Sequence, residues 1–406
     1  MTPNEQTGNA ATSNAMSPNA PGHTARKSLR ILHIVTLVTT DGAFGGPVRV
    51  AENLTDYLSG EGHDVTVVAC RGEGLGETEQ FKHSTLRMFP TLTRLYKRSF
   101  VLTASLWAFL WVLRNRGRFD VVHVHLARDL MTGPLGWLAA SASTRVIVQP
   151  HGMVMPREGL VYRIFDAFTI NPIIARADEI LYLNDDELHD LESVVPAGAS
   201  LRHLANGVPI DDGVGAVHEY DDTSRPLEFL FLSRLHERKR PVDFARAAVL
   251  VNQGASQRDL PRARFALAGP DEGSAAAVQE CIDASGMSDE IRLEGPVEPS
   301  SVLGRFAKTD VFVLPSIAEP FGMVVLEAMS MGVPVIVTTE CGLADLVTEF
   351  DAGVVVEPGP ETLAVAMSSL IDDRDRLRKL SANALRAAQS MSVAGVGRRL
   401  MELYST

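Results

Sequence analysis

Two glutamates spaced eight positions apart carry the clearest chemical signal in the chain. Glu319 and Glu327 bracket the segment Glu-Pro-Phe-Gly-Met-Val-Val-Leu-Glu, which lies between the apolar runs 311–314 and 333–337. This order predicts strand, tight loop, helix, turn and strand. In open α/β sheets, ligands bind where loops leave the carboxyl ends of strands, and a helix N-terminus there offers N–H groups to an anion. We therefore expect Glu319 at a ligand site.

The second glutamate should lie inside the helix that follows this loop. A helix beginning near Phe321 or Gly322 places Glu327 roughly 7–8 Å along its axis, at about 1.5 Å per residue. Its neighbours are almost all apolar, which predicts a buried helix. Because an isolated buried carboxylate is unfavourable, Glu327 needs a partner rich in donors, and a pair of sugar hydroxyls would serve. The alternative is a chance pair of glutamates on a solvated helix face.

A basic loop follows the predicted strand 227–232. It contains Arg234 and Lys239. Two phosphates need cations that reach them from a loop, where arginine offers a planar fork and lysine a movable point charge. A basic loop alone is more often solvated surface. Combined with the two glutamates, the loop favours binding of a diphosphate.

In the first half of the chain, a glycine-containing loop follows the predicted strand 30–37. Its Gly45 and Gly46 would let the backbone approach a ligand closely and leave helix N–H groups exposed. No G-x-G-x-x-G spacing occurs there, which weakens a dehydrogenase interpretation. A simple turn is the alternative reading of this loop.

Several histidines lie on or just after predicted strands. His151 follows strand 145–149, where a neutral imidazole can donate to a phosphate or sugar oxygen. His123 and His125 alternate along strand 121–125, without acidic residues placed to complete a zinc site. The D-x-D string 373–375 lies in a charge-rich helical run. We therefore expect no metal.

The glutamate segment resembles the E-x7-E signature of the retaining family-4 glycosyltransferases, which have the two-domain GT-B fold and use nucleotide sugars. The resemblance implies that Glu319 contacts hydroxyls of the transferred sugar and that Glu327 holds the ribose. It also implies a metal-independent reaction without a cofactor. Ser233 and Cys341 depart from glycines of the family pattern, which leaves the donor sugar open. The implied site residues are, for catalysis, Glu319 and His151, and, for donor binding, Arg234, Lys239, Phe321, Gly322, Glu327, Val297, Gly45 and Gly46.

Strand-like and helix-like segments alternate from residue 29 onward, which predicts an α/β protein with parallel sheets. We expect two Rossmann-like, doubly wound domains facing a central cleft, as in GT-B proteins. The predicted strands are 30–37, 64–69, 121–125, 145–149 and 179–183, then 227–232, 264–267, 291–293, 311–314, 333–337 and 353–356. The predicted organisation is a disordered tail at 1–28, an acceptor domain at 29–208, a linker at 209–225, a donor domain at 226–391 and a helix at 392–406 that crosses back to the first domain.

Composition limits the classes of partner. The net charge of −12 argues against a nucleic-acid surface, and three scattered cysteines fit a reducing, cytoplasmic compartment. The apolar stretch 100–113, with basic residues on both sides, is shorter than the ~20 residues that span a bilayer. It could form a core helix packed on the first sheet, or a helix that binds to the cytoplasmic face of a membrane.

We expect a retaining hexosyltransferase that moves a sugar from a UDP- or GDP-sugar to a glycan or lipid-linked acceptor, in cell-envelope or exopolysaccharide biosynthesis. Two alternatives remain open. A GT-B sugar-nucleotide epimerase would process the donor without an acceptor, and a noncatalytic protein would bind the sugar nucleotide without turnover.

Overall fold

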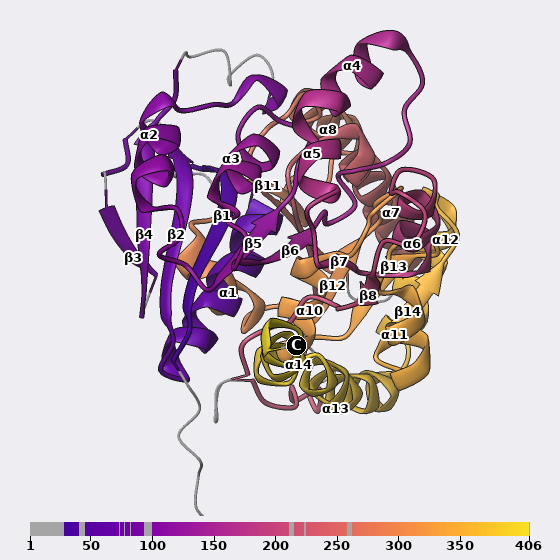
Figure 1. Cartoon of the computed structure of the whole chain (residues 1–406). Coiled ribbons are helices and arrows are strands. Elements are labelled where there is room, and N and C mark those ends of the chain that lie inside the picture. Colours follow the sequence, from indigo (N-terminus) through magenta and orange to yellow (C-terminus); the bar gives the residue numbers. More distant parts are fainter. Residues whose placement is uncertain are drawn as a thin grey trace, which may run out of the picture.

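The chain folds into two α/β domains (Figure 1). The computed structural model describes residues 28–39, 45–72, 74–76, 78–81, 83–92, 100–210, 215–222, 225–257 and 262–405. Most of the tail predicted at 1–28 therefore lies outside the described residues, as do 40–44 of the glycine loop and 93–99 before the apolar stretch.

The first domain is built on an eight-stranded sheet with the order β3-β4-β2-β1-β5-β6-β7-β8. All neighbouring strands are parallel except β3 and β4, which pair antiparallel. Parallel strands buried on both faces read as apolar runs, which is why the sequence predicted most of them. The strands are β1 (Arg30–Val38), β2 (Asp64–Arg71), β3 (Thr78–Phe81), β4 (Ser84–Pro90), β5 (Val121–His125), β6 (Arg145–Gln149), β7 (Glu179–Tyr182) and β8 (Leu201–His203).

Helices cover both faces of this sheet. Successive β1 residues point to opposite faces, so that Ile31 packs with α1 and α14, whereas Leu32 packs with α2, α3 and α5. The helices involved are α1 (Gly45–Gly60), α2 (Leu106–Asn115), α3 (Thr132–Ala139), α4 (Leu160–Thr169), α5 (Asn171–Ile174), α6 (Asp185–Glu192) and α14 (Val393–Ser405).

The second domain contains a fully parallel six-stranded sheet with the order β11-β10-β9-β12-β13-β14. Phe229 and Phe231 of β9 point into one core and Leu230 and Leu232 into the other. The elements are β9 (Glu228–Leu232), α7 (Pro241–Gln257), β10 (Arg264–Ala268), α8 (Ala275–Ser285), β11 (Ile291–Gly295), α9 (Val302–Phe306), β12 (Val311–Leu314), α10 (Met323–Ser330), β13 (Val335–Thr338), α11 (Ala344–Phe350), β14 (Gly353–Val356), α12 (Pro360–Ile371) and α13 (Arg374–Ser390). The two-domain α/β prediction is confirmed by this topology.

The chain crosses between the domains twice, and the two crossings lie side by side. The N–H of Val208 donates to the carbonyl of Met391 at 3.0 Å, and the N–H of Val393 donates to the carbonyl of Val208 at 2.9 Å. A Cβ at Gly207 would lie 2.7 Å from the Cα of Val393. Glycine is therefore needed at position 207, where the two crossing segments meet. Helix α14 follows this junction and packs on the first domain.

Three strands were missed by the sequence prediction, and one was misplaced at its start. Strands β3 and β4 form an antiparallel hairpin after β2, where helix was expected, and β8 is a short edge strand. The predicted strand 333–337 begins instead at Val335, after Pro334, which has no N–H to donate to a ladder. Hairpins and three-residue edge strands lack the long apolar runs on which the prediction depended.

Candidate functional site

Glu319 lies in the loop between β12 and α10, held by the loop that follows β13. Its N–H donates to the carbonyl of Glu340 at 3.0 Å, and its carbonyl accepts from the N–H of Gly342 at 2.8 Å. The side chain is only 12% exposed and forms an ion pair with the ammonium of Lys239. The structure thus brings together the acid and one of the two cations that the sequence singled out.

Lys239 reaches this acid from the loop after β9. A short 3₁₀ turn, Glu237–Lys239, ends at Arg240, which takes a left-handed conformation with a φ of 55°. The lysine side chain is 18% exposed. A half-buried ammonium beside a carboxylate can exchange that partner for a more highly charged phosphate, so the pair is suited to receiving a diphosphate.

Gly322 caps the helix α10 that carries the second glutamate. Its φ of 89° lies in the left-handed region, and a Cβ there would lie 3.2 Å from Val325 Cγ2 and 3.3 Å from Cys341 Sγ. Because glycine offers no side-chain cap, the first N–H groups of α10 remain suited to a negatively charged ligand. The adjacent Phe321 is buried at 5% exposure and anchors the loop in the second core.

Glu327 is buried in α10, as predicted, but its partner comes from the other domain. Arg49 Nε lies 3.2 Å from Glu327 Oε1, and the same guanidinium contacts Glu52 at 3.0 Å. Burial raises the pKa of the Glu327 carboxyl, while the Arg49 charge opposes this shift. Arg49 lies on α1, one turn after Gly45 and Gly46, so the glycine pair begins a helix that contacts the glutamate helix across the domain boundary.

Removing this interdomain ion pair should destabilise the protein measurably. We expect Arg49→Met to lower the free energy of unfolding by about 1–3 kcal/mol, because it leaves a buried carboxylate without its cation. Urea denaturation of Arg49→Met, Glu327→Gln and the double variant measures the coupling. Glu52→Gln is the matched control, since it removes only a surface contact within α1, expected to be worth about 0.3–0.5 kcal/mol. Strict additivity of the two single changes would show that the pair contributes nothing.

Arg234 lies on the loop after β9 and Val297 on the loop after β11, and β10 separates these two strands in the sheet. Within the described residues, the Arg234 guanidinium donates to Glu272, with Nη1 at 2.8 and 3.0 Å from the two carboxylate oxygens. Val297 follows β11 and packs partly against the second core. These two candidates therefore take separate partners here, unlike Glu319 and Lys239. Asp271, on the loop after β10, accepts from three backbone N–H groups at the start of α8.

His151 lies at the carboxyl end of β6, with a left-handed φ of 55° and only 8% exposure. Its Nε2 is 2.8 Å from His125 Nδ1, and His125 Nε2 is 3.0 Å from His33 Nδ1. Tyr404 of α14 continues the series, with its hydroxyl 3.3 Å from His33 Nε2 and 2.6 Å from His123 Nδ1. A buried chain of five side chains thus connects the loop after β6 to the C-terminal helix. We call it the histidine relay.

Burial keeps these imidazoles neutral. It lowers the pKa of His123 and of His151 to about 3 and holds the pKa of His33 and His125 well below its usual range. Burial likewise raises the pKa of the Tyr404 hydroxyl. The relay therefore consists of neutral groups, each with one proton to donate.

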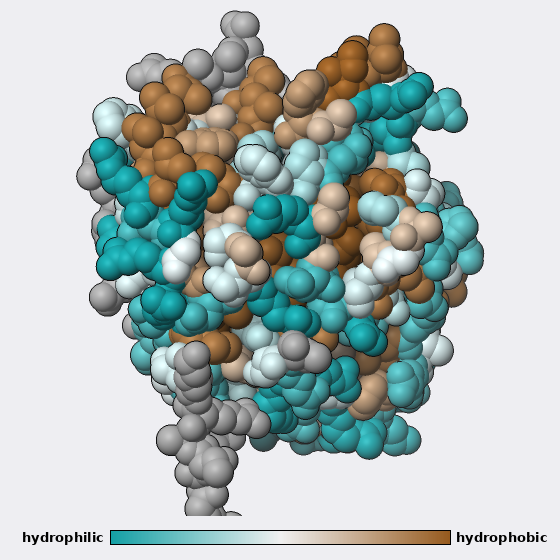
Figure 2. Space-filling model, viewed as in Figure 1, coloured by the Kyte–Doolittle hydropathy of each residue, from teal (hydrophilic) through white to brown (hydrophobic). Residues whose placement is uncertain are grey.

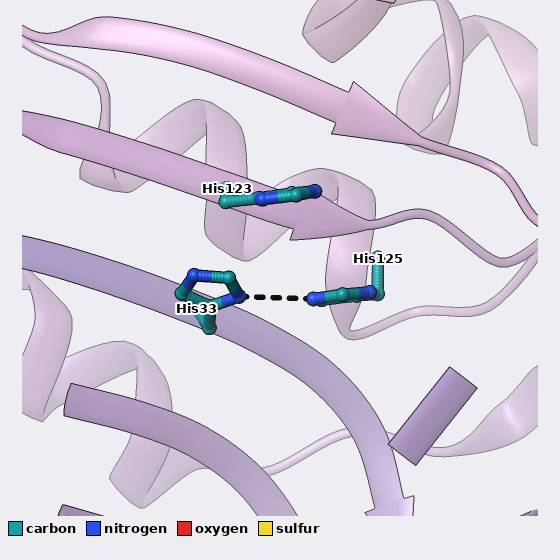
Figure 3. A group of neighbouring side chains, drawn as sticks. All are labelled: His33, His123 and His125. Carbon is teal, nitrogen blue, oxygen red and sulfur yellow. Dashed lines mark hydrogen bonds between the residues drawn. The ribbon is translucent and has the colours of Figure 1, made fainter. Parts of the chain in front are cut away.

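His33, His123 and His125 are close enough together to raise the question of a metal site (Figure 3), since one ring nitrogen of each lies within 4.8 Å of the others. The rings of His123 and His125, however, are stacked with an interplanar angle of 5°. Lone pairs in parallel planes do not converge on one ion at the roughly 2.0–2.1 Å that zinc requires. The dashed line in Figure 3 joins His33 and His125, whose facing nitrogens share a hydrogen bond. The geometry favours a hydrogen-bonded relay.

A relay of neutral groups has two proton arrangements. A neutral imidazole has one donor and one acceptor nitrogen, and the hydroxyl donates once along the chain, so all bonds must point the same way. If they point toward His123, the Nδ1 of His151 is an acceptor, and if they point toward His151, this atom is a donor. That Nδ1 is buried without a hydrogen-bond partner among the described residues. Only the second arrangement gives the donating imidazole that the sequence suggested.

Loops of the two domains meet beside these residues. Gly152 lies so close to Pro320 that a Cβ on it would be 2.7 Å from the proline Cβ. Asn184 caps α6 by accepting from the N–H of Glu187, and its Nδ2 donates to the carbonyl of Pro320 at 2.7 Å. The segment after His151 therefore contacts the residue after Glu319. The two catalytic candidates flank one interdomain contact.

Four residues of this site were missed from the sequence. They are Arg49, His33, Asn184 in its contact with Pro320, and Tyr404. Each acts on a partner far away in the sequence, and for Arg49 and Glu327 the separation is 278 residues. A lone arginine in a helix or a lone histidine in a strand gives no signal of such a partner. The alternation of His123 and His125 was the one available hint of the relay.

Comparison with solved structures defines the class of fold. The chain is similar to HepE from Anabaena in complex with UDP and glucose, with a TM-score of 0.71 and 16% identity over 93% of this chain and 99% of that one. It is also similar to sucrose-phosphate synthase from Thermosynechococcus elongatus, with a TM-score of 0.70 and 17% identity over 93% and 98%. The architecture is that of the GT-B glycosyltransferases.

Two family models match the two halves of the chain. The model described as glycosyl transferases group 1 matches residues 220–387, and the glycosyl transferase 4-like domain matches residues 45–207. The chain belongs to the family-4 glycosyltransferases.

Among curated relatives, a D-inositol 3-phosphate glycosyltransferase from Thermobispora bispora is 27% identical over 84% of this chain and 88% of its own length. A protein of the same name from Nocardia farcinica is 28% identical over 71% of this chain and 67% of its own length. The two sequences are similar to this chain across both domains.

Proposed function

We propose that the protein is a retaining, metal-independent hexosyltransferase that uses a UDP- or GDP-sugar. The observation that carries the proposal is the pairing of Glu319 with Lys239 directly beside the Pro320–Gly152 contact, where the loop of His151 reaches the donor domain. Sugar hydroxyls are satisfied by a carboxylate and diphosphates by an ammonium, so one nucleotide sugar can engage both side chains.

The chain supplies groups for each end of such a donor. Lys239 and the N-terminus of α10 stabilise charge on the departing diphosphate, which is electrostatic stabilisation that needs no metal. Glu319 accepts from hydroxyls of the transferred sugar, and the Nδ1 of His151 donates to an oxygen near the anomeric carbon in the second relay arrangement. Glu327 accepts from the ribose and exchanges Arg49 for it. Attack from the face of the leaving phosphate, which takes the acceptor proton, retains the anomeric configuration.

The acceptor we propose is a glycan or a lipid-linked sugar at the cytoplasmic face of a membrane, within cell-envelope or exopolysaccharide assembly. UDP is the favoured nucleotide, because the similar HepE structure was solved with UDP. A second candidate acceptor is D-inositol 3-phosphate, since that compound appears in the names of the curated relatives.

The test is a product analysis with purified protein. A thermal-shift screen of UDP- and GDP-sugars first identifies the donor, because a ligand that binds the native state raises its melting temperature. The donor is then incubated alone, with D-inositol 3-phosphate, and with a polyprenyl-diphosphate-linked sugar, each with and without EDTA. We expect acceptor-dependent release of nucleoside diphosphate that survives EDTA and yields an α-linked product by NMR. An epimerised donor without acceptor, or binding without turnover, would instead establish one of the two alternatives.

Lys239→Ala should weaken donor binding strongly. Loss of a charge-assisted contact of about 1.5–3 kcal/mol corresponds to a roughly 10- to 150-fold higher Kd for the nucleotide sugar. Isothermal titration with the selected donor measures this change. Lys379→Ala, a change in α13, is the matched control and should leave the Kd unaltered. Equal Kd values for wild type and Lys239→Ala would show that this lysine does not contribute to donor binding.

A further inference from the structure

Exposed apolar side chains are concentrated on one part of the first domain. Of the 17 large hydrophobic residues exposed within the described chain, 14 lie between residues 92 and 168, rather than being scattered along the sequence. Figure 2 shows brown areas along the upper edge of the molecule, over α2, α3 and α4, which pack in that order. This surface, here called the apolar edge, consists of Leu92, Val101, Leu102, Leu106, Trp107, Leu113, Leu130, Trp137, Met155, Leu160, Val161, Tyr162, Ile164 and Phe168.

Helix α4 has its apolar face turned away from the protein. A surface helix ordinarily buries its apolar stripe and exposes its charges. Here Val161 is 78% exposed and Phe168 75% exposed, whereas Asp166 points inward and pairs with buried Arg128 at 2.8 Å. The ion pair fixes this orientation. Packing within the chain does not account for the apolar residues of α4, so they are available to an external apolar phase.

Helix α2 has one buried face and one exposed apolar face. Ala108 and Val112 are buried against the first sheet, as in a core helix. Leu106 and Trp107, on another face, are 51% and 60% exposed. The core-helix interpretation of the stretch 100–113 therefore holds for one face of α2, and the exposed face remains available for the membrane contact.

The charge around the apolar edge differs from that of the whole chain. Residues 100–168 contain seven arginines and four acidic residues, in a protein with a net charge of −12. Among these charges, Asp129 is buried, Arg128 is paired with Asp166, and Arg145 is paired with Glu179. Arg114 and Arg116, in contrast, lie exposed at the end of α2. A locally basic, tryptophan-containing apolar surface matches the interface of an anionic bilayer.

We propose that the apolar edge seats the protein on a bilayer that contains anionic phospholipid, with α2 and α4 in the headgroup zone. Within the described residues, no helix is long and apolar enough to span a membrane, so the contact would be peripheral. A second copy of the chain fits the surface less well. Two such edges would bring together like charges from both sets of arginines, which opposes self-association and favours lipid.

The apolar edge lies next to the proposed acceptor side of the active site. Nine residues after His151, the chain enters α4, so the loop after β6 links the catalytic candidate directly to the docking helix. A sugar acceptor held in the bilayer by a lipid tail would thereby arrive beside the interdomain contact. This choice of acceptor rests on the proposed function, whereas docking itself can be measured without turnover.

Vesicle flotation tests the docking surface on the full chain. Wild-type protein is mixed with phosphatidylcholine vesicles, with or without about 30 mol% phosphatidylglycerol. We expect wild type to float with the anionic vesicles. Val161→Ser/Ile164→Ser should bind them at least tenfold more weakly, because two inserted side chains are lost. Arg114→Gln/Arg116→Gln should lose about fivefold per arginine on anionic vesicles only.

The control pair Val217→Ser/Val365→Ser removes two other exposed apolar side chains, 43% and 72% exposed, that lie outside the apolar edge, and this variant should bind like wild type. The proposal is overturned if wild type does not float, if the α4 variant floats as well as wild type, or if light scattering shows lipid-free self-association that this variant abolishes. Donor turnover, assayed without vesicles, reports separately on the proposed function. A protein that shows no donor turnover but floats normally would contradict the proposed enzyme activity and would still support the docking surface.

Discussion

Glu319→Gln is expected to lower the rate of sugar transfer by about 10²- to 10³-fold, the loss typical when one group that stabilises a transition state is removed. The amide keeps the size of the side chain but removes the charge that pairs with Lys239 and that accepts from sugar hydroxyls. Because the backbone of Glu319 is held by Glu340 and Gly342, the loop should keep its conformation. Release of nucleoside diphosphate under initial-rate conditions, with the donor and acceptor found in the screen, measures the effect.

A control separates this loss from general damage. Glu349→Gln changes an exposed carboxylate of α11 in the same domain and should leave the rate unaltered. Thermal unfolding should show that Glu319→Gln remains folded. Wild-type turnover by the folded Glu319→Gln variant would exclude Glu319 from the reaction.

The free energy of unfolding should fall steeply as the pH drops below about 6.5, which is the ordinary pKa of a histidine side chain. The relay imidazoles are buried and neutral, with the pKa of His123 and His151 lowered to about 3 and that of His33 and His125 lowered well below its usual range. Below pH 6.5 the unfolded chain binds protons that the native state does not, so unfolding is favoured by about 1.4 kcal/mol per pH unit for each group. For His123 and His151, this loss continues until their folded-state pKa values of about 3 are reached.

Buried acids oppose part of this loss. Burial raises the pKa of Asp129 to about 6, so the native state binds that proton first and gains about 1 kcal/mol at pH 5.5. Burial also raises the pKa of Glu187 and Glu327, with an effect of the same sign. The four buried histidines have a larger effect than these acids, so the free energy of unfolding still increases with pH over this range.

Urea denaturation between pH 7.5 and 5 measures the slope. Replacing one relay residue, as in His123→Asn, should lower the number of protons taken up on unfolding by about one, and the slope falls accordingly. His189→Asn changes an exposed residue of α6 and should leave the slope unchanged. Unfolding free energies that stay constant from pH 7 to 5 in wild type would contradict a buried neutral relay. The same variants assayed for transfer show whether the relay sets the proton on His151.

Short-range patterns along the chain predicted most of the sheet strands correctly. Val121–His125 and Arg145–Gln149 were predicted at their observed bounds, because strands buried on both faces are written as local apolar runs. The capped start of α6 at Asn184 is also local, since the cap contacts an N–H three residues on. The β3–β4 hairpin was missed, because its strands are short and carry no such run.

The sequence by itself determined the two-domain α/β plan, the strand-end loops that carry Glu319 and Lys239, and the burial of Glu327, since each follows from residues close together along the chain. Only the tertiary structure decided that Glu327 meets Arg49, that four histidines and Tyr404 form one relay, and that α4 turns its apolar face outward. These arrangements join residues separated by up to 371 positions, or depend on which face of a helix another element already covers. Hydrophobic periodicity identifies an apolar face, but the packing of the whole fold decides whether that face lies in the core or at the surface.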